Sequence, residues 1–167
     1  YLIDSYVVFG QAAPGPISLA AVGAGNGGYR LNFGGEPIRA GDLNGDGRDD
    51  QLVANFAGSA TAVVFGKAGG APVGTADIVN GVGGIALYDE TSSSSMSAAA
   101  AGDVDGDGTP DILLGQSRYN KLYPSNSSGG PFTGAAYVVS GSAALHVRGD
   151  DLIEGGAGDD VLFGGGG

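Results

Sequence analysis

Two short segments of the chain place acidic and amide side chains at alternating positions, a spacing that suits a hard cation. Residues 41–50 read Gly-Asp-Leu-Asn-Gly-Asp-Gly-Arg-Asp-Asp, and residues 102–111 read Gly-Asp-Val-Asp-Gly-Asp-Gly-Thr-Pro-Asp, with an offset of 61 residues. Side-chain oxygens stand at positions 1, 3, 5 and 9 of each loop, and a backbone carbonyl is expected to contribute at position 7. The predicted ligands are Asp42, Asn44, Asp46, the Arg48 carbonyl and Asp50 in the first loop, and Asp103, Asp105, Asp107, the Thr109 carbonyl and Asp111 in the second.

The chemistry of these donors favours Ca2+ as the cofactor. Crowded carboxylates repel one another without a cation, and Ca2+ accepts about six to eight oxygens in a flexible geometry, whereas Mg2+ needs a stricter octahedron. Zn2+ prefers nitrogen and sulfur ligands, and the chain has no Cys and a single His. An EF-hand would end in Glu at position 12, where this chain has Val53 or Leu114. Four glycines permit the sharp backbone turns: Gly45, Gly47, Gly106 and Gly108.

The alternative is that Asp-Gly-Asp-Gly is only turn chemistry, which Asp and Gly favour with or without a metal. Two copies in register, each followed by a similar apolar run, favour calcium over this alternative. The simplest role for such an ion is structural, because it would hold the loop between two strands.

Composition narrows the fold and the partners. The chain has 167 residues, 35 of them Gly, and a net charge of −11. This Gly content opposes helical bundles, and the charge opposes binding to nucleic acid or anionic membranes. No apolar run approaches the roughly 20 residues that a membrane helix needs. The chain begins at Tyr1 within a predicted strand, so we expect it to be part of a longer protein.

Short β-branched and aromatic runs predict strands. These runs cover residues 6–10, 51–56, 62–66, 112–115 and 136–141, and three of them end in similar Gly-terminated sequences. Residues 17–19 and 77–79 are also predicted as strands, at the outer edge of each unit, and no helical periodicity is evident. Internal repeats of about four strands each are typical of propeller blades.

The segment Ser97-Ala-Ala-Ala-Ala-Gly-Asp-Val-Asp-Gly-Asp-Gly-Thr-Pro-Asp-Ile-Leu-Leu-Gly115 resembles the FG-GAP repeats of integrin α-subunit β-propellers and their bacterial relatives. The resemblance covers roughly residues 1–143 and also includes the Val-Val-Phe-Gly runs that end at Gly10 and Gly66. It implies an all-β chain, namely a partial β-propeller of two four-stranded antiparallel blades plus part of another, with calcium between two strands of a blade. Gln51, Asn55 and Gln116 depart from the family pattern.

A nine-residue period follows the last blade. The sequence from Arg148 to Gly167 resembles the RTX nonapeptide of parallel β-rolls, in which Gly-rich turns and an Asp bind Ca2+ between successive coils. The resemblance implies that Asp151 and Asp160 are metal ligands. Such stacking needs at least three repeats, and the chain holds one complete and one partial copy, so both a filled site and a frayed end of a longer array stay open.

The motifs and the two resemblances predict four segments in the chain. Residues 1–35 are the end of a preceding blade and its connection, 36–84 form the blade with the first Asp loop, 85–145 form the blade with the second, and 146–167 begin the β-roll. Three aromatic side chains of an insertion in the last blade are candidates for contact with a partner, although packing over a neighbouring blade is the simpler alternative: Tyr119, Tyr123 and Phe132.

The resulting hypothesis is a calcium-binding structural or adhesive module of a secreted or cell-surface bacterial protein, which contacts proteins or glycans and is not an enzyme. Its expected partners are other blades or chains that complete the propeller, and a surface protein or glycan. It is expected outside the cell, and the RTX resemblance implies type I secretion. The alternatives are the non-catalytic propeller part of a secreted hydrolase or lyase, or a subunit docked by its open edge in a larger assembly.

Overall fold

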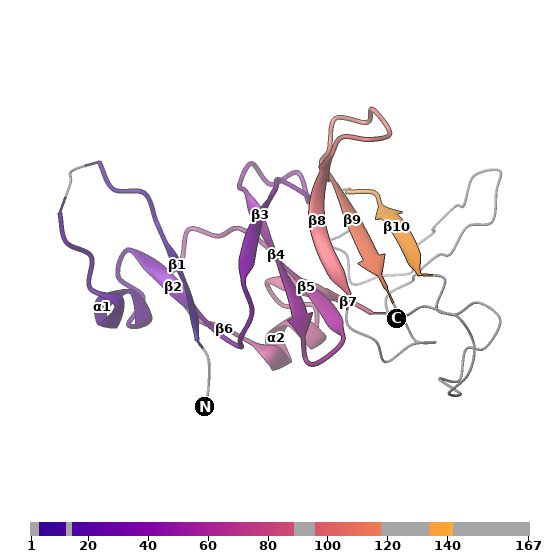
Figure 1. The fold of residues 1–167 in the computed structure, drawn as a ribbon. Coiled ribbons are helices and arrows are strands. Elements are labelled where there is room, and N and C mark those ends of the chain that lie inside the picture. Colours follow the sequence, from indigo (N-terminus) through magenta and orange to yellow (C-terminus); the bar gives the residue numbers. More distant parts are fainter. Residues whose placement is uncertain (1–3, 13–14, 89–95, 118–133, 142–167) are drawn as a thin grey trace.

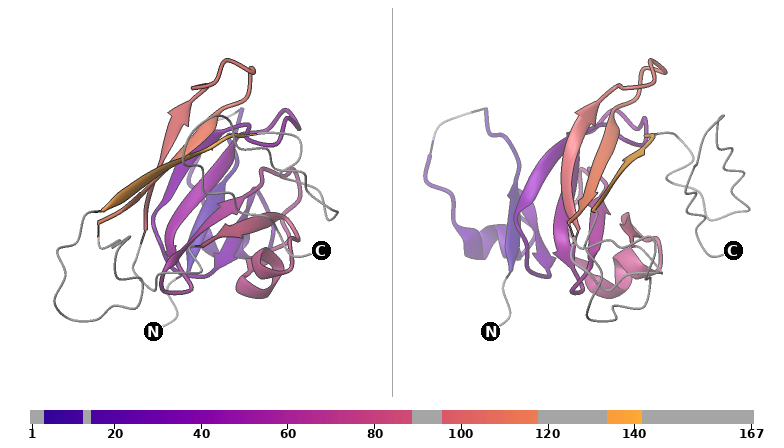
Figure 2. Two further views of the ribbon diagram at one scale, coloured as in Figure 1. Left: turned by 90° about the vertical axis from the view of Figure 1, so that its right-hand side faces the viewer. Right: turned by 45° about the vertical axis from the view of Figure 1, so that its right-hand side comes forward.

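The described part of the chain is a succession of small β-sheets. A computed structural model describes residues 4–12, 15–88, 96–117 and 134–141. Within these residues the chain forms ten strands in three sheets, with two one-turn helices between strands. The second sheet lies between the first and the third (Figures 1 and 2). This arrangement confirms the predicted all-β class.

The first sheet combines neighbouring and distant parts of the chain. Strand β1 (Ser5–Val8) pairs antiparallel with β2 (Gly28–Asn32), and β2 pairs in parallel with the short β6 (Val73–Gly74). Helix α1 (Leu19–Gly23) lies in the connection between β1 and β2. The third strand of this sheet, β6, therefore comes after most strands of the second sheet in sequence.

The second sheet is a complete four-stranded antiparallel unit. Its strands are β3 (Pro37–Gly41), β4 (Asp50–Phe56), β5 (Ala60–Val64) and β7 (Gly84–Leu87), paired in that order. Helix α2 (Thr75–Val79) precedes β7. This sheet has the architecture expected of one propeller blade.

The third sheet repeats the first three strands of the second. Strands β8 (Ser97–Gly102), β9 (Asp111–Gln116) and β10 (Ala135–Val139) pair antiparallel, with β9 in the middle. The register shifts just before Gly41 on β3 and, at the equivalent place, just before Gly102 on β8. The two sheets therefore share a local irregularity as well as an order of strands.

Five predicted strands are confirmed, and two are wrong. The apolar runs predicted as strands fall on β1, β4, β5, β9 and β10. Residues 77–79 instead lie in helix α2, and residues 17–19 lead into helix α1. Each helix is stabilised at its start by a side chain: Ser18 accepts a hydrogen bond from the Ala21 N–H, and Asp77 accepts one from the Gly74 N–H at 2.7 Å. These caps satisfy amides that a helix start leaves unpaired.

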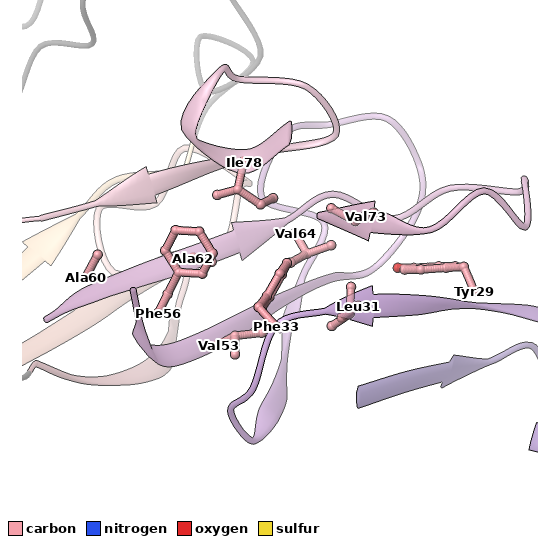
Figure 3. Packing of buried hydrophobic residues seen from close by; sticks show 10 residues of the cluster. All are labelled: Tyr29, Leu31, Phe33, Val53, Phe56, Ala60, Ala62, Val64, Val73 and Ile78. Atoms are coloured by element: carbon pink, nitrogen blue, oxygen red, sulfur yellow. The ribbon is translucent and has the colours of Figure 1, made fainter. Parts of the chain in front are cut away.

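Two hydrophobic clusters hold the sheets together. One lies between the first and second sheets and includes Leu31, Val53 and Phe56 (Figure 3). The other lies between the second and third sheets and includes Leu52 and Ile112. The second sheet therefore contributes alternate side chains to both clusters. This explains why every residue of β5 is buried, since a sheet covered on both faces has near-continuous apolar strands.

Candidate metal centres

The two Asp loops occupy equivalent places in the second and third sheets. Residues 42–49 connect β3 to β4, and residues 103–110 connect β8 to β9, so both loops lie at the same end of their sheets (Figure 1). The four predicted turn glycines all have positive φ angles, between 73° and 93°. Residues with a Cβ adopt this region only at a cost. The prediction that these glycines permit the sharp turns is confirmed.

The second loop brings three carboxylates together. One ligand oxygen from each of Asp103, Asp105 and Asp111 lies within 4.8 Å of the other two. Asp103 and Asp105 are exposed, whereas Asp111 is buried. Among the described residues this is the one group of three acids with such a spacing.

This spacing matches the coordination sphere of a calcium ion. Oxygens that bind one Ca2+ lie about 2.3–2.6 Å from it, so any two of them are at most about 5 Å apart. The donors in the loop are all oxygens, which suits a hard cation and not Zn2+. Asp103, Asp105 and Asp111 therefore fit the predicted ion by donor type and by separation.

The first loop has the same design with less negative charge. Asn44 stands where the second loop has Asp105, and it is almost fully buried. Asp46 is 3.7 Å from the guanidinium of Arg48, which balances part of its charge. Asp49 lies outside the ligand pattern and forms two hydrogen bonds with the exposed Arg39. An ion in this loop would thus meet fewer uncompensated carboxylates.

Backbone N–H groups hold the side-chain oxygens of both loops in similar patterns. At position 1, Asp42 accepts hydrogen bonds from the amides of residues 46 and 47, and Asp103 accepts them from residues 106 and 108. The residues at positions 3 and 5 each accept from the amide two residues later, as in Asx turns. Asp107 takes part in this pattern through Thr109 but does not belong to the group of three close carboxylates. The carbonyls of Arg48 and Thr109 stay predicted ligands.

The ninth position carries a buried carboxylate in each loop. Asp50 accepts hydrogen bonds from Leu43 N–H at 2.9 Å and Gly66 N–H at 2.7 Å. Asp111 likewise accepts from Val104 N–H at 2.6 Å and Gly141 N–H at 3.0 Å. Each carboxylate therefore joins the start of its loop to the end of a third strand. Gly66 and Gly141 were not predicted as partners of the loops, and their one signal in the sequence is the repeated Gly at the strand ends.

The two buried carboxylates differ in acidity. Burial raises the pKa of Asp50 to about 6, since desolvation disfavours the charged form. Burial also acts to raise the pKa of Asp111, but hydrogen bonds from Val104 and Gly141 help to outweigh it, and the net pKa lies below the usual value. A cation in either loop would favour the charged form and lower both pKa values.

The remaining residues singled out in the sequence lie outside the two Asp loops. Asn55 has a φ of 58°, in the left-handed region that Asn tolerates better than most residues with a side chain. The aromatic candidates Tyr119, Tyr123 and Phe132 and the β-roll ligands Asp151 and Asp160 lie outside the described residues. In the described part of the chain, neither helix could span a bilayer.

Comparison with known proteins supports the repeat pattern. A family model for an FG-GAP-like repeat matches residues 42–114, and a model for the FG-GAP repeat matches residues 97–139. The first match contains both Asp loops, and the second runs from β8 through β10. Searches among curated proteins and among solved structures gave no match. Residues 42–139 therefore match FG-GAP-type repeats, and their sheets are consistent with the blades of a β-propeller.

Proposed function

We propose that this chain is a calcium-dependent, propeller-type interaction module of a secreted or cell-surface bacterial protein, with a structural or adhesive role. The observation that carries the proposal is the approach of Asp103, Asp105 and Asp111 to within 4.8 Å in a loop that joins two strands of one sheet. FG-GAP repeats suggest a protein–protein interaction module and are typical of extracellular or surface proteins. The type I secretion route is proposed only from the RTX-like residues 148–167.

Calcium would act on this module by stabilising its loops. In the second loop the ion would be held by Asp103, Asp105, Asp107 and Asp111 with the Thr109 carbonyl, and in the first by the equivalent set that includes Asn44. The ion supplies positive charge where carboxylates otherwise repel one another. Because it binds the folded loops and has little affinity for the unfolded chain, it shifts the equilibrium toward the folded state.

Direct titration of the metal-free chain with CaCl2 tests this proposal. We expect at least two ions to bind per chain, with dissociation constants of about 10⁻⁴–10⁻³ M as in other extracellular modules. Isothermal titration calorimetry measures both quantities, and MgCl2 serves as the matched control that should bind more weakly. Absence of calcium binding at concentrations well above this range would contradict the proposal.

We also propose that the module is not itself catalytic. Within the described residues, the clustered carboxylates are held by backbone amides inside the Asp loops. An acid–base pair needs groups that are free to approach a substrate. These acids are better suited to a cation than to proton transfer.

The outer face of the third sheet is the surface that we propose for contact with a further blade. In the second sheet Leu43, Leu52 and Val63 are fully buried in the cluster that faces the third sheet. The residues at the equivalent places of the third sheet are exposed by 42–59%. They are Val104, Leu113 and Val138.

The equivalence of the two sheets supports one kind of occupant for this face. Leu113 and Val138 are register partners on neighbouring strands, with Ala99 on the other side of Leu113, so they form one apolar row across the sheet. The second sheet uses the equivalent pair, Leu52 and Val63, to pack against a further sheet of the same kind. We therefore propose that another FG-GAP-type blade covers Val104, Leu113 and Val138.

Self-association of the 167-residue chain tests this surface. With no further blade available, we expect the chain to form species larger than its monomer mass of 16.2 kDa, because exposed apolar sheet faces associate. Leu113→Lys and Val138→Lys should each shift the population toward monomer, measured by light scattering after size exclusion. Val79→Lys, at another exposed apolar position on α2, is the matched control. A stable, soluble monomer of the unmodified chain would contradict the proposal.

A further inference from the structure

Two glycines at strand ends donate hydrogen bonds to the Asp loops. Their strands are not the ones that the loops connect in sequence. Gly66 follows β5, and Gly141 follows β10. The N–H of Gly66 donates to Oδ1 of Asp50 at 2.7 Å, and the N–H of Gly141 donates to Oδ1 of Asp111 at 3.0 Å. Each predicted ligand at position 9 is thus held by a residue 16 or 30 positions further along the chain.

The loops also pack so closely against these two glycines that a residue with a Cβ would not fit at either position. A Cβ on Gly66 would lie 2.5 Å from the carbonyl oxygen of Asp49 and 2.7 Å from Cβ of Arg48. A Cβ on Gly141 would overlap the carbonyl oxygen of Pro110. These neighbours are backbone or near-backbone atoms, so a side-chain rotation cannot make room. Neither glycine has a positive φ, so its small size and not its backbone freedom is what the site requires.

A third copy of the same strand ending provides an internal comparison. Residues 6–10 read Tyr-Val-Val-Phe-Gly, nearly the sequence that ends at Gly66. No Asp loop precedes Gly10 in this chain, and a Cβ on Gly10 would meet no atom within 4 Å. The close approach therefore occurs at the two copies that stand beside an Asp loop.

The second loop has an additional contact with the same strand end. The hydroxyl of Ser140 donates a hydrogen bond to Oδ2 of Asp105 at 2.8 Å. The end of β10 thus holds two of the three close carboxylates, Asp105 through Ser140 and Asp111 through Gly141.

We propose that Gly66 and Gly141 are positioning residues for cation binding, and that each couples the occupancy of its loop to the placement of the strand end beside it. This inference rests on the proposed calcium binding. Hydrogen-bond partners of metal ligands fix the orientation of those ligands, and their loss typically lowers metal affinity about 10- to 100-fold. An alanine at either position would break the N–H contact and push away the peptide groups just before position 9. The predicted carbonyl ligands at position 7 lie in this part of each loop.

The test uses Gly66→Ala and Gly141→Ala, with Gly10→Ala as the matched control. Calorimetric titration with CaCl2 should show that each of the first two variants loses affinity about 10- to 100-fold at one site and keeps the other. Gly10→Ala should bind like the unmodified chain. The increase in melting temperature on adding Ca2+ should also shrink in the first two variants, whereas a merely structural defect would lower the melting temperature with and without calcium by the same amount.

The outcomes separate this inference from the proposed function. An unmodified chain that binds no calcium contradicts the proposed function itself. An unmodified chain that binds calcium, together with folded Gly66→Ala and Gly141→Ala variants of unchanged affinity, overturns the inference alone. If either variant fails to fold, the backbone amide signals of Gly66 and Gly141 are followed by NMR in the unmodified chain during the titration. These signals should shift as the loops fill, and signals that stay in place would overturn the inference.

Discussion

Chelation of calcium with EGTA should lower the melting temperature of the chain by about 6–12 °C relative to a solution with calcium at ten times its dissociation constant. Each filled site then contributes about 1.4 kcal/mol to the free energy of unfolding, and two loops contribute about 3 kcal/mol. For a chain of this length about 1 kcal/mol corresponds to a shift of roughly 2–4 °C. Circular dichroism during heating measures the difference.

The control for this experiment is MgCl2 at the same ionic strength. Because the chain carries a net charge of −11, any divalent salt reduces general repulsion through screening. Only specific binding in the Asp loops should make Ca2+ more effective than Mg2+. Equal melting temperatures in calcium, magnesium and EGTA would show that the loops do not depend on calcium for stability.

The substitution Asp111→Ala should be among the most destabilising changes in the loops. It removes a buried ligand and also leaves the Val104 and Gly141 N–H groups without the carboxylate that accepts from both. The Gly141 donor is buried, whereas the Val104 donor is half-buried. An unsatisfied buried donor costs about 1–3 kcal/mol, so we expect a loss of about 1–3 kcal/mol or more in the free energy of unfolding even without calcium. Urea unfolding with and without Ca2+ measures this loss, and the calcium response of the second loop should disappear.

Asp49→Ala is the matched control for this substitution. Asp49 is an exposed loop carboxylate whose hydrogen bonds go to Arg39, outside the ligand pattern. Exposed ion pairs contribute little to stability, so the control should unfold like the unmodified chain and keep its calcium response. If Asp111→Ala were as stable as Asp49→Ala, the buried carboxylate would not have the joining role that its hydrogen bonds indicate.

Most of the strands and the design of both loops were predictable from local sequence. The alternating acids and their glycines specify a turn with convergent oxygens, and the β-branched runs specify the strands that flank it. The two helices were not predictable by the same means. Each has five residues, and helical periodicity becomes visible only in windows of about 11 residues or more. The capping residues Ser18 and Asp77 were the available signals.

Contacts between distant segments account for the rest. Gly66 and Gly141 were predictable as strand ends. Their hydrogen bonds to Asp50 and Asp111 depend on how β5 and β10 lie beside the loops. Burial also depends on distant segments: Leu52 is buried, whereas Leu113 at the equivalent place of the next sheet is exposed. A local pattern states which residues are apolar, whereas the neighbouring sheet decides which of them are covered.

The parallel pairing of β2 with β6 has a consequence for the order in which the chain can fold during synthesis. Leu31 and Val73 are register partners although 42 residues separate them, whereas β3, β4 and β5 follow one another through short connections. Pairings between distant residues form late, because a long loop must close first. Strands β1 and β2 leave the ribosome before β6 does, yet two paired strands are only marginally stable alone. This pair of strands must therefore wait for residues 73–74, and the second sheet serves as the template on which the first is completed.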